Sequence, residues 1–217
     1  MPSLPIALLT GFEPFGGETV NPSWEAVRQL DGKRLGGHRV VARLLPTAFD
    51  ASLRELKGAV RALKPTLLLG VGQAGGRSRL SIERVAINLQ DASIPDNAGA
   101  QPMDTAVIAG APAAYFSSLP VKAMVAALNQ AGLPAELSYT AGTYVCNHVA
   151  FAMLHLAARH RAMRAGFMHI PYLPAQAARH RHASSMALDD VVRGLSLALR
   201  VAATTQHDAP LRGGALD

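Results

Sequence analysis

The sequence is short of cysteine. Cys146 is the only cysteine in 217 residues, so no disulfide can form within the chain. A secreted scaffold stapled by disulfides is therefore excluded. A lone thiol suits a reducing compartment, and we expect a cytoplasmic protein.

Long apolar runs and nucleic-acid motifs are also missing. No run approaches the roughly 20 residues of a membrane-spanning helix, and no basic segment precedes the first apolar stretch, as it would in a secretory signal. The formal charge is +6, and Arg and His residues gather between positions 159 and 182. This region lacks interleaved aromatic residues, and the chain has no zinc-ligand pattern, so a solvated surface is favoured over a nucleic-acid site. We expect no membrane, nucleic-acid or metal partner.

What the sequence does contain is a regular alternation of strand and helix patterns. Apolar stretches predict strands at 5–12, 39–45, 66–71, 80–89, 136–140 and 166–170, and periodicity predicts helices at 22–30, 51–63, 121–130, 147–160 and 188–203. Strands separated by helices are typical of a mostly parallel sheet covered on both faces. The sequence therefore predicts a single α/β/α sandwich over residues 1–206. Residues 207–217, which are Gly-rich and lack apolar periodicity, are predicted to form a flexible tail.

A glycine motif follows the third predicted strand. The run from Gly70 to Gly75 matches G-x-G-x-x-G, and Asp91 lies about twenty residues further on, as in a dinucleotide site. That site needs a helix opening inside the glycine run to hold the pyrophosphate. The residues that follow have strand composition instead. The motif is therefore a weak indication of nucleotide binding, and close backbone approach is the favoured explanation.

Cys146 lies where a predicted strand gives way to the helix predicted at 147–160. Backbone N–H groups at a helix N-terminus favour an anion, so a thiol there can have a lowered pKa and act as a nucleophile. The alternative is a small buried apolar side chain. A thiol nucleophile needs an imidazole within reach, and the imidazole needs a group that orients it.

His169 is the best-placed histidine for this role. His148 and His155 project to the other side of the predicted helix, whereas His169 ends a predicted strand, and strand ends collect ligands in parallel α/β sheets. A core histidine satisfied by a carbonyl is the alternative. Alternation along 80–89 places Glu83 on a face with Val85 and Ile87, where a buried carboxylate needs a partner. That partner is His169 or one of the arginines.

Several segments carry a more specific signal. They are TGFEPFGG at 10–17, NPS at 21–23, GQAGGR at 72–77, ERVAIN at 83–88, IPDN at 94–97, AGTYVCNH at 141–148 and HIPYLP at 169–174. In these segments, which extend from Leu9 to about Gln176, the chain resembles the pyroglutamyl-peptidase I family, also called pyrrolidone-carboxylate peptidases.

The resemblance implies a cysteine exopeptidase that hydrolyses the bond after an N-terminal pyroglutamyl residue of peptides. It assigns Cys146 as the nucleophile, His169 as the proton carrier and Glu83 as the orienting carboxylate, with a thioester acyl-enzyme and no cofactor. It also implies a substrate pocket, lined by Phe12, Phe15, Asn21, Gln73, Ile94, Tyr144 and Val145. Relatives are often homotetramers, so a tetramer is expected. Ser93 departs from the family pattern, because many relatives carry an arginine there.

Two other functions stay open at this stage. One is a nucleotide-dependent oxidoreductase that uses Gly70 to Gly75. The other is a non-catalytic binding scaffold in which Cys146 is inert.

Overall fold

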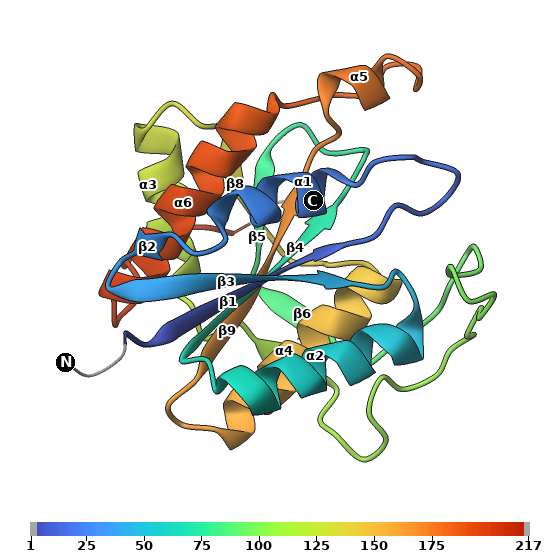
Figure 1. The fold of residues 1–217 in the computed structure, drawn as a ribbon, viewed down its shortest axis with the longest axis horizontal. Helices are drawn as coiled ribbons and strands as arrows, with labels where there is room; N and C mark the ends of the chain where they lie inside the picture. Colours follow the sequence, from blue (N-terminus) through green and yellow to red (C-terminus); the bar gives the residue numbers. More distant parts are fainter. Residues whose placement is uncertain (1–3, 215–217) are drawn as a thin grey trace.

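The structure, a computed structural model, describes residues 4–214 and has a seven-stranded sheet at its centre (Figure 1). Its strand order is β2-β3-β1-β4-β9-β5-β8. The bounds are β1 Ile6–Phe12, β2 Arg34–Leu35, β3 His38–Leu45, β4 Leu67–Gln73, β5 Leu80–Glu83, β8 Ala135–Ser138 and β9 Arg164–Ile170. The pairs β1/β3, β1/β4, β4/β9 and β5/β8 are parallel, whereas β2/β3 and β5/β9 are antiparallel. The mostly parallel sheet predicted from the sequence is confirmed.

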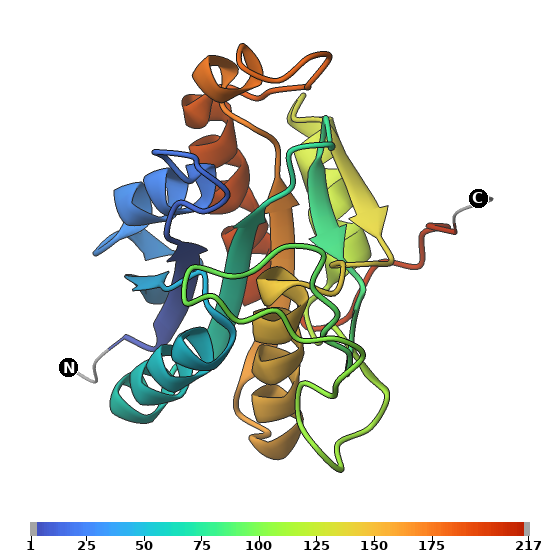
Figure 2. The same ribbon diagram turned by 90° about the vertical axis from the view of Figure 1, so that its right-hand side faces the viewer.

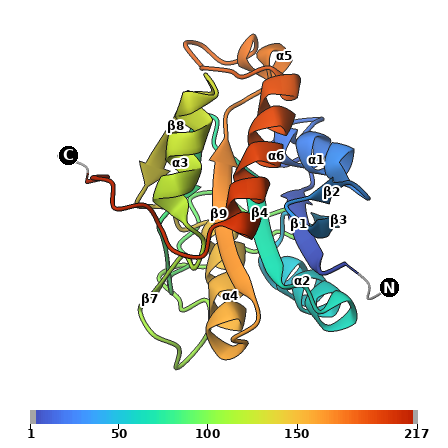
Figure 3. The same cartoon turned by 90° about the vertical axis from the view of Figure 1, so that its left-hand side faces the viewer.

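Helices cover both faces of the sheet. The apolar sides of α1, α3 and α6 pack on one face, and those of α2 and α4 pack on the other (Figures 1 and 3). The bounds are α1 Pro22–Val27, α2 Phe49–Leu63, α3 Val121–Gln130, α4 Val145–Arg159, α5 Pro174–Ala177 and α6 Leu188–Thr204, with a 3-10 turn at Arg28–Leu30 after α1. This arrangement is the predicted α/β/α sandwich. Within residues 4–214 no helix is both long and apolar enough to cross a bilayer.

The predicted strand at 80–89 is wrong as a single element. The chain changes partners at Arg84, whose N–H donates to the Ser138 carbonyl and whose own carbonyl accepts from Ser117 N–H. β5 therefore ends at Glu83, and β6 (Val85–Ile87) pairs with β7 (Ala114–Phe116) in a separate two-stranded sheet. The face expected to join Glu83 with Val85 and Ile87 does not continue past Glu83.

The long segment between β6 and β7 lies beside α4 (Figure 2). Asn147, in the first turn of α4, is hydrogen-bonded to the start of this segment. The Asn147 side chain accepts from Ile87 N–H at 3.0 Å and donates to the Ile87 and Leu89 carbonyls, each at 2.9 Å. Because Asn147 is fully buried, these bonds satisfy backbone groups that would otherwise be costly to bury.

The described part of the C-terminal segment contacts α3 and β8. The Asp208 carboxylate accepts from the Lys122 and Ala123 N–H groups at the start of α3, each at 3.0 Å. Further along, the Leu211 carbonyl accepts from Lys122 Nζ, and the Gly213 carbonyl accepts from the Tyr139 hydroxyl. Residues 207–214 therefore lie along α3 and β8, and the last three residues of the predicted tail are outside the described part of the chain.

Candidate functional site

Cys146 and His169 are both placed next to Gly72. His169 lies near the carboxyl end of β9, where its register partner on β4 is Gly72. A Cβ atom built on Gly72 would lie only 2.7 Å from Cys146 Sγ. The sulfur therefore lies directly over the backbone that pairs with His169, and only glycine leaves room for it there.

Cys146 lies inside α4 instead of just before it. The helix begins at Val145, two residues earlier than predicted, with Tyr144 as the N-cap residue in an extended conformation. Cys146 is the second residue of the helix, so its own N–H is among the four at the helix start that have no partner within the helix.

The thiol is not acidified as the sequence led us to expect. Burial raises the pKa of Cys146 to about 12, the nearby Glu83 carboxylate adds to the rise, and Arg77 opposes it. Its neighbours explain the burial, because the Phe167 ring also lies against Gly72, 3.1 Å from the same built Cβ atom. A raised pKa favours the protonated thiol, so forming a thiolate requires a base.

Glu83 and His169 form a buried pair. His169 Nδ1 and Glu83 Oε1 lie 2.7 Å apart, and the two residues expose only 4% and 2% of their surfaces. The second carboxylate oxygen, Oε2, is buried without a hydrogen-bond partner among the described residues. Because Nδ1 faces the carboxylate, Nε2 is the ring nitrogen left for Cys146.

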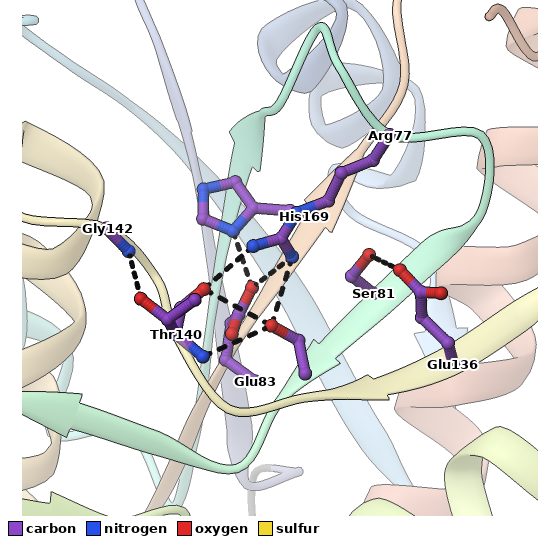
Figure 4. A network of polar contacts seen from close by, with 8 residues as sticks. Arg77, Ser81, Glu83, Glu136, Thr140, Gly142 and His169 are labelled. Atoms are coloured by element: carbon purple, nitrogen blue, oxygen red, sulfur yellow. Dashed lines mark hydrogen bonds and ion pairs between the residues drawn. The ribbon is translucent and has the colours of Figure 1, made fainter. Parts of the chain in front are cut away.

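Arg77 is a site residue that the sequence reasoning missed. Its Nη1 donates to Glu83 Oε1 at 2.7 Å, so Arg77 and His169 converge on the same oxygen (Figure 4). Arg77 also donates to Ser138 Oγ at 3.2 Å and to the Thr140 carbonyl at 2.7 Å. The sequence left His169 or an arginine as partner of Glu83, and the structure contains both. The arginine at the end of the GQAGGR segment was the available signal.

The histidines set aside on sequence grounds lie elsewhere. His148 is buried against the Phe49 ring, with centroids 5.3 Å apart, and burial lowers its pKa to about 4. His155 Nδ1 lies 3.0 Å from the Tyr115 hydroxyl, and His180 stacks on Tyr172. These contacts hold the three rings at other places, whereas His169 is the register partner of Gly72.

A small apolar pocket is lined in part by Cys146. Six of the seven residues predicted for the substrate pocket line it: Phe12, Phe15, Asn21, Gln73, Tyr144 and Val145. Thr47 also lines it and was missed, because nothing in the local pattern marks a single threonine. Ile94 was predicted and is not among the lining residues; it leaves 44% of its surface exposed.

Some polar side chains that line the pocket have all their hydrogen-bonding groups occupied, and others do not. Asn21 Oδ1 accepts from Ser23 N–H at the start of α1, and Asn21 Nδ2 donates to the Glu13 carbonyl. The Thr47 hydroxyl donates to the same Glu13 carbonyl, which leaves its oxygen able to accept. Gln73 Oε1 accepts from Gln176, whereas its NH₂ group has no partner within residues 4–214. Gln73 thus retains an unused donor and Thr47 an unused acceptor, beside a pocket whose exposed lining is apolar.

The glycine run does not form a nucleotide site. β4 continues to Gln73, and Arg77 N–H then closes a turn on the Ala74 carbonyl, so no helix opens there. A Cβ atom on Gly70 would meet the Phe167 ring at 2.4 Å, and one on Gly75 would meet Tyr172 at 2.1 Å. These glycines allow close packing. In the part of the chain that is described, no group of three or more His, Cys, Asp or Glu side chains is arranged to hold a metal.

The family model for pyroglutamyl peptidase matches residues 6–205. A pyrrolidone-carboxylate peptidase from Cupriavidus taiwanensis is 55% identical over 98% of this chain and 100% of its own length. The crystal structure of pyroglutamyl peptidase I from Bacillus amyloliquefaciens superposes with a TM-score of 0.93 at 45% identity, covering 97% of this chain and 100% of that one. Pyrrolidone carboxyl peptidase from Thermococcus litoralis gives a TM-score of 0.92 at 36% identity, with coverage of 96% and 100%. These similarities, together with the thiol, imidazole and carboxylate at one end of the sheet, show that the chain belongs to the pyroglutamyl peptidase family.

Proposed function

We propose that Cys146, His169 and Glu83 are the catalytic triad of a peptidase that removes N-terminal pyroglutamate from peptides. The observation that carries this proposal is that Cys146 Sγ lies over Gly72, the register partner of His169, and that Glu83 Oε1 lies 2.7 Å from His169 Nδ1. Membership of the pyroglutamyl peptidase family supports peptides with N-terminal pyroglutamate as the substrates. The apolar pocket beside the thiol supports a small uncharged acyl group.

The raised pKa of Cys146 defines the first step. A neutral thiol must lose its proton as it attacks, so His169 Nε2 takes the proton while Sγ bonds to the carbonyl carbon. The imidazolium that forms is stabilised by Glu83, whose buried carboxylate has an unpartnered oxygen and gains from new positive charge nearby. The Cys146 N–H at the start of α4 is the donor that we assign to the oxyanion.

The second half of the reaction reverses the proton transfer. The carbon–nitrogen bond breaks as His169 gives its proton to the departing amine, which leaves a thioester on Cys146. His169 then takes a proton from water, and the resulting hydroxide attacks the thioester. Pyroglutamate leaves, and the thiol regains its proton.

The polar groups of the pocket match a lactam ring. A pyroglutamyl ring carries one N–H donor and one C=O acceptor on a flat apolar body. The NH₂ group of Gln73 can donate to the carbonyl, and the Thr47 oxygen can accept from the N–H. A charged N-terminal amine would have no acidic partner among the lining residues. Unpaired groups of this kind reject mismatched substrates by large factors.

The test is hydrolysis of a pyroglutamyl-coumarin reporter by the wild type and by Cys146→Ser. We expect steady release of coumarin by the wild type and a loss of about 10⁴-fold or more in the variant. Unfolding of both proteins in urea controls for stability. Undiminished turnover by Cys146→Ser would rule out the thiol mechanism, and failure of the wild type to cleave the reporter would rule out the substrate.

We further propose that the enzyme works in the cytoplasm as a homotetramer. A catalytic thiol must stay reduced, which a glutathione-buffered compartment ensures. The tetramer rests on resemblance to the family. Light scattering on the purified protein tests it, since a tetramer has four times the 22.8 kDa mass of one chain.

A further inference from the structure

Gln176, in α5 behind the pocket, has a side-chain amide with only one permitted orientation. It is 97% buried, with 3% of its surface exposed. Its Oε1 accepts from Leu173 N–H at 3.2 Å, and its Nε2 donates to the Val20 carbonyl at 3.0 Å. Because a backbone N–H only donates and a carbonyl only accepts, exchanging the two ends of the amide would break both bonds.

The orientation of the Gln176 amide determines the orientation of the Gln73 amide. Gln176 Nε2 lies 3.2 Å from Gln73 Oε1. If Gln73 were turned over, two NH₂ groups would face each other at that distance with no acceptor between them. Gln73, a lining residue of the pocket, must therefore present its oxygen to Gln176, which leaves its NH₂ group directed away from Gln176.

We infer that Gln176 is a positioning residue that fixes Gln73 with its N–H donors available to the substrate, so that the site selects acyl groups with a carbonyl at that edge. The inference rests on the proposed function and deepens it. A free glutamine amide has two nearly equivalent orientations, and only one can donate to a lactam carbonyl. Locking the amide before binding removes the cost of choosing between them.

Gln176 also anchors the loop between β1 and α1, and this second role must be separated from the first. Its Nε2 lies 3.2 Å from Glu18 Oε2, and Glu18 in turn binds Arg179 and, at 2.8 Å, His180. Glu18→Gln weakens this anchor. It leaves the bonds to Leu173 and Val20 that orient Gln176, so it is a matched control for loop loosening.

The experiment is a double-mutant cycle with Gln176→Met and Gln73→Leu, which preserve approximate length and remove the amides. We expect Gln176→Met to raise KM for the pyroglutamyl reporter about tenfold with kcat nearly unchanged, because the lost contact orients a binding group. The inhibition constant of 2-pyrrolidinone, a bare lactam ring, should rise by the same factor. In the Gln73→Leu background, Gln176→Met should cost less than twofold, because no amide remains to be oriented.

Equal costs of Gln176→Met in both backgrounds would overturn the inference. A rise in KM for Glu18→Gln as large as that for Gln176→Met would also overturn it, since loop anchoring would then account for the effect. If these results came with efficient wild-type cleavage of the reporter, the proposed function would stand and only the role of Gln176 would fall. A wild type that does not cleave the reporter would remove both.

Discussion

Gly72→Ala should disable the enzyme by displacing its sulfur. The new Cβ atom would lie 2.7 Å from Cys146 Sγ and 3.1 Å from the Phe167 ring. Ordinary contacts between such atoms are about 3.5–4.0 Å, so the sulfur must move by roughly 1 Å. A displacement of that size at a reacting atom can cost about 100-fold in rate.

The matched control is Gly166→Ala on the neighbouring strand β9. Its Cβ atom would be equally crowded, at 2.6 Å from Leu119 Cδ1, but it faces the other side of the sheet, away from Cys146. Overpacking of this kind costs about 1–3 kcal/mol of stability in either variant. We therefore expect similar losses in the free energy of unfolding and very different losses in activity.

The assay is kcat/KM for the pyroglutamyl-coumarin reporter, measured beside urea unfolding of each variant. Gly72→Ala should fall about 100-fold, and Gly166→Ala should stay within about threefold of the wild type. Wild-type activity in a fully folded Gly72→Ala would refute the placement of Sγ over Gly72. Equal losses in the two variants would show that strain anywhere in the sheet disables the site, and the local argument would fail.

Three further predictions concern charge. Glu83→Gln should lower the pKa of Cys146, because the carboxylate raises it, and the rate of alkylation by iodoacetamide at several pH values measures that pKa. The same variant should reduce kcat by about 100-fold or more, because an amide cannot stabilise the imidazolium, and turnover of the reporter measures this loss. Arg77→Met should slow alkylation at alkaline pH, because Arg77 lowers that same pKa, and faster alkylation would contradict the role given to Arg77. His148 has a pKa of about 4 when folded against 6.5 for a free imidazole, so below pH 6.5 the unfolded chain binds a proton that the folded one does not. Stability should therefore fall by about 3 kcal/mol between pH 7 and pH 4, and His148→Phe should remove most of that fall in urea unfolding.

Local patterns predicted most of the fold. The helix over 121–130 has the observed bounds, and the strands containing Leu9, Leu69 and Phe167 are in place, because apolar runs and helical periodicity depend on neighbours in the chain. The break at Arg84 was missed because its cause is distant: the chain there exchanges Ser138 for Ser117 as a hydrogen-bonding partner. β7 was missed for the same reason, since three residues without a partner strand carry little signal.

The residues of the candidate site also differ in whether local sequence patterns could reveal them. Cys146, His169 and Glu83 were proposed from helix geometry, strand patterns and the family segments. Arg77, Thr47 and Gln176 could not be assigned roles, because what they do depends on which atoms they face across the fold. The acidity of the thiol was misjudged because its position at a helix start is visible in sequence, whereas its burial beside Phe167 and Glu83 is not.

The raised pKa of Cys146 also affects how this protein reacts with oxidants. Peroxides and disulfides react with thiolates, and the raised pKa of Cys146 lowers the fraction of thiolate at neutral pH. Cys146 should thus be a poor target for peroxide or mixed-disulfide formation, although it is a nucleophile. Electrophiles that bind in the pocket, where His169 can take the proton of the Cys146 thiol, should inactivate the enzyme much better than small diffusing reagents. Selective inhibitors of this enzyme are therefore best sought among carbonyl compounds that fit the pocket.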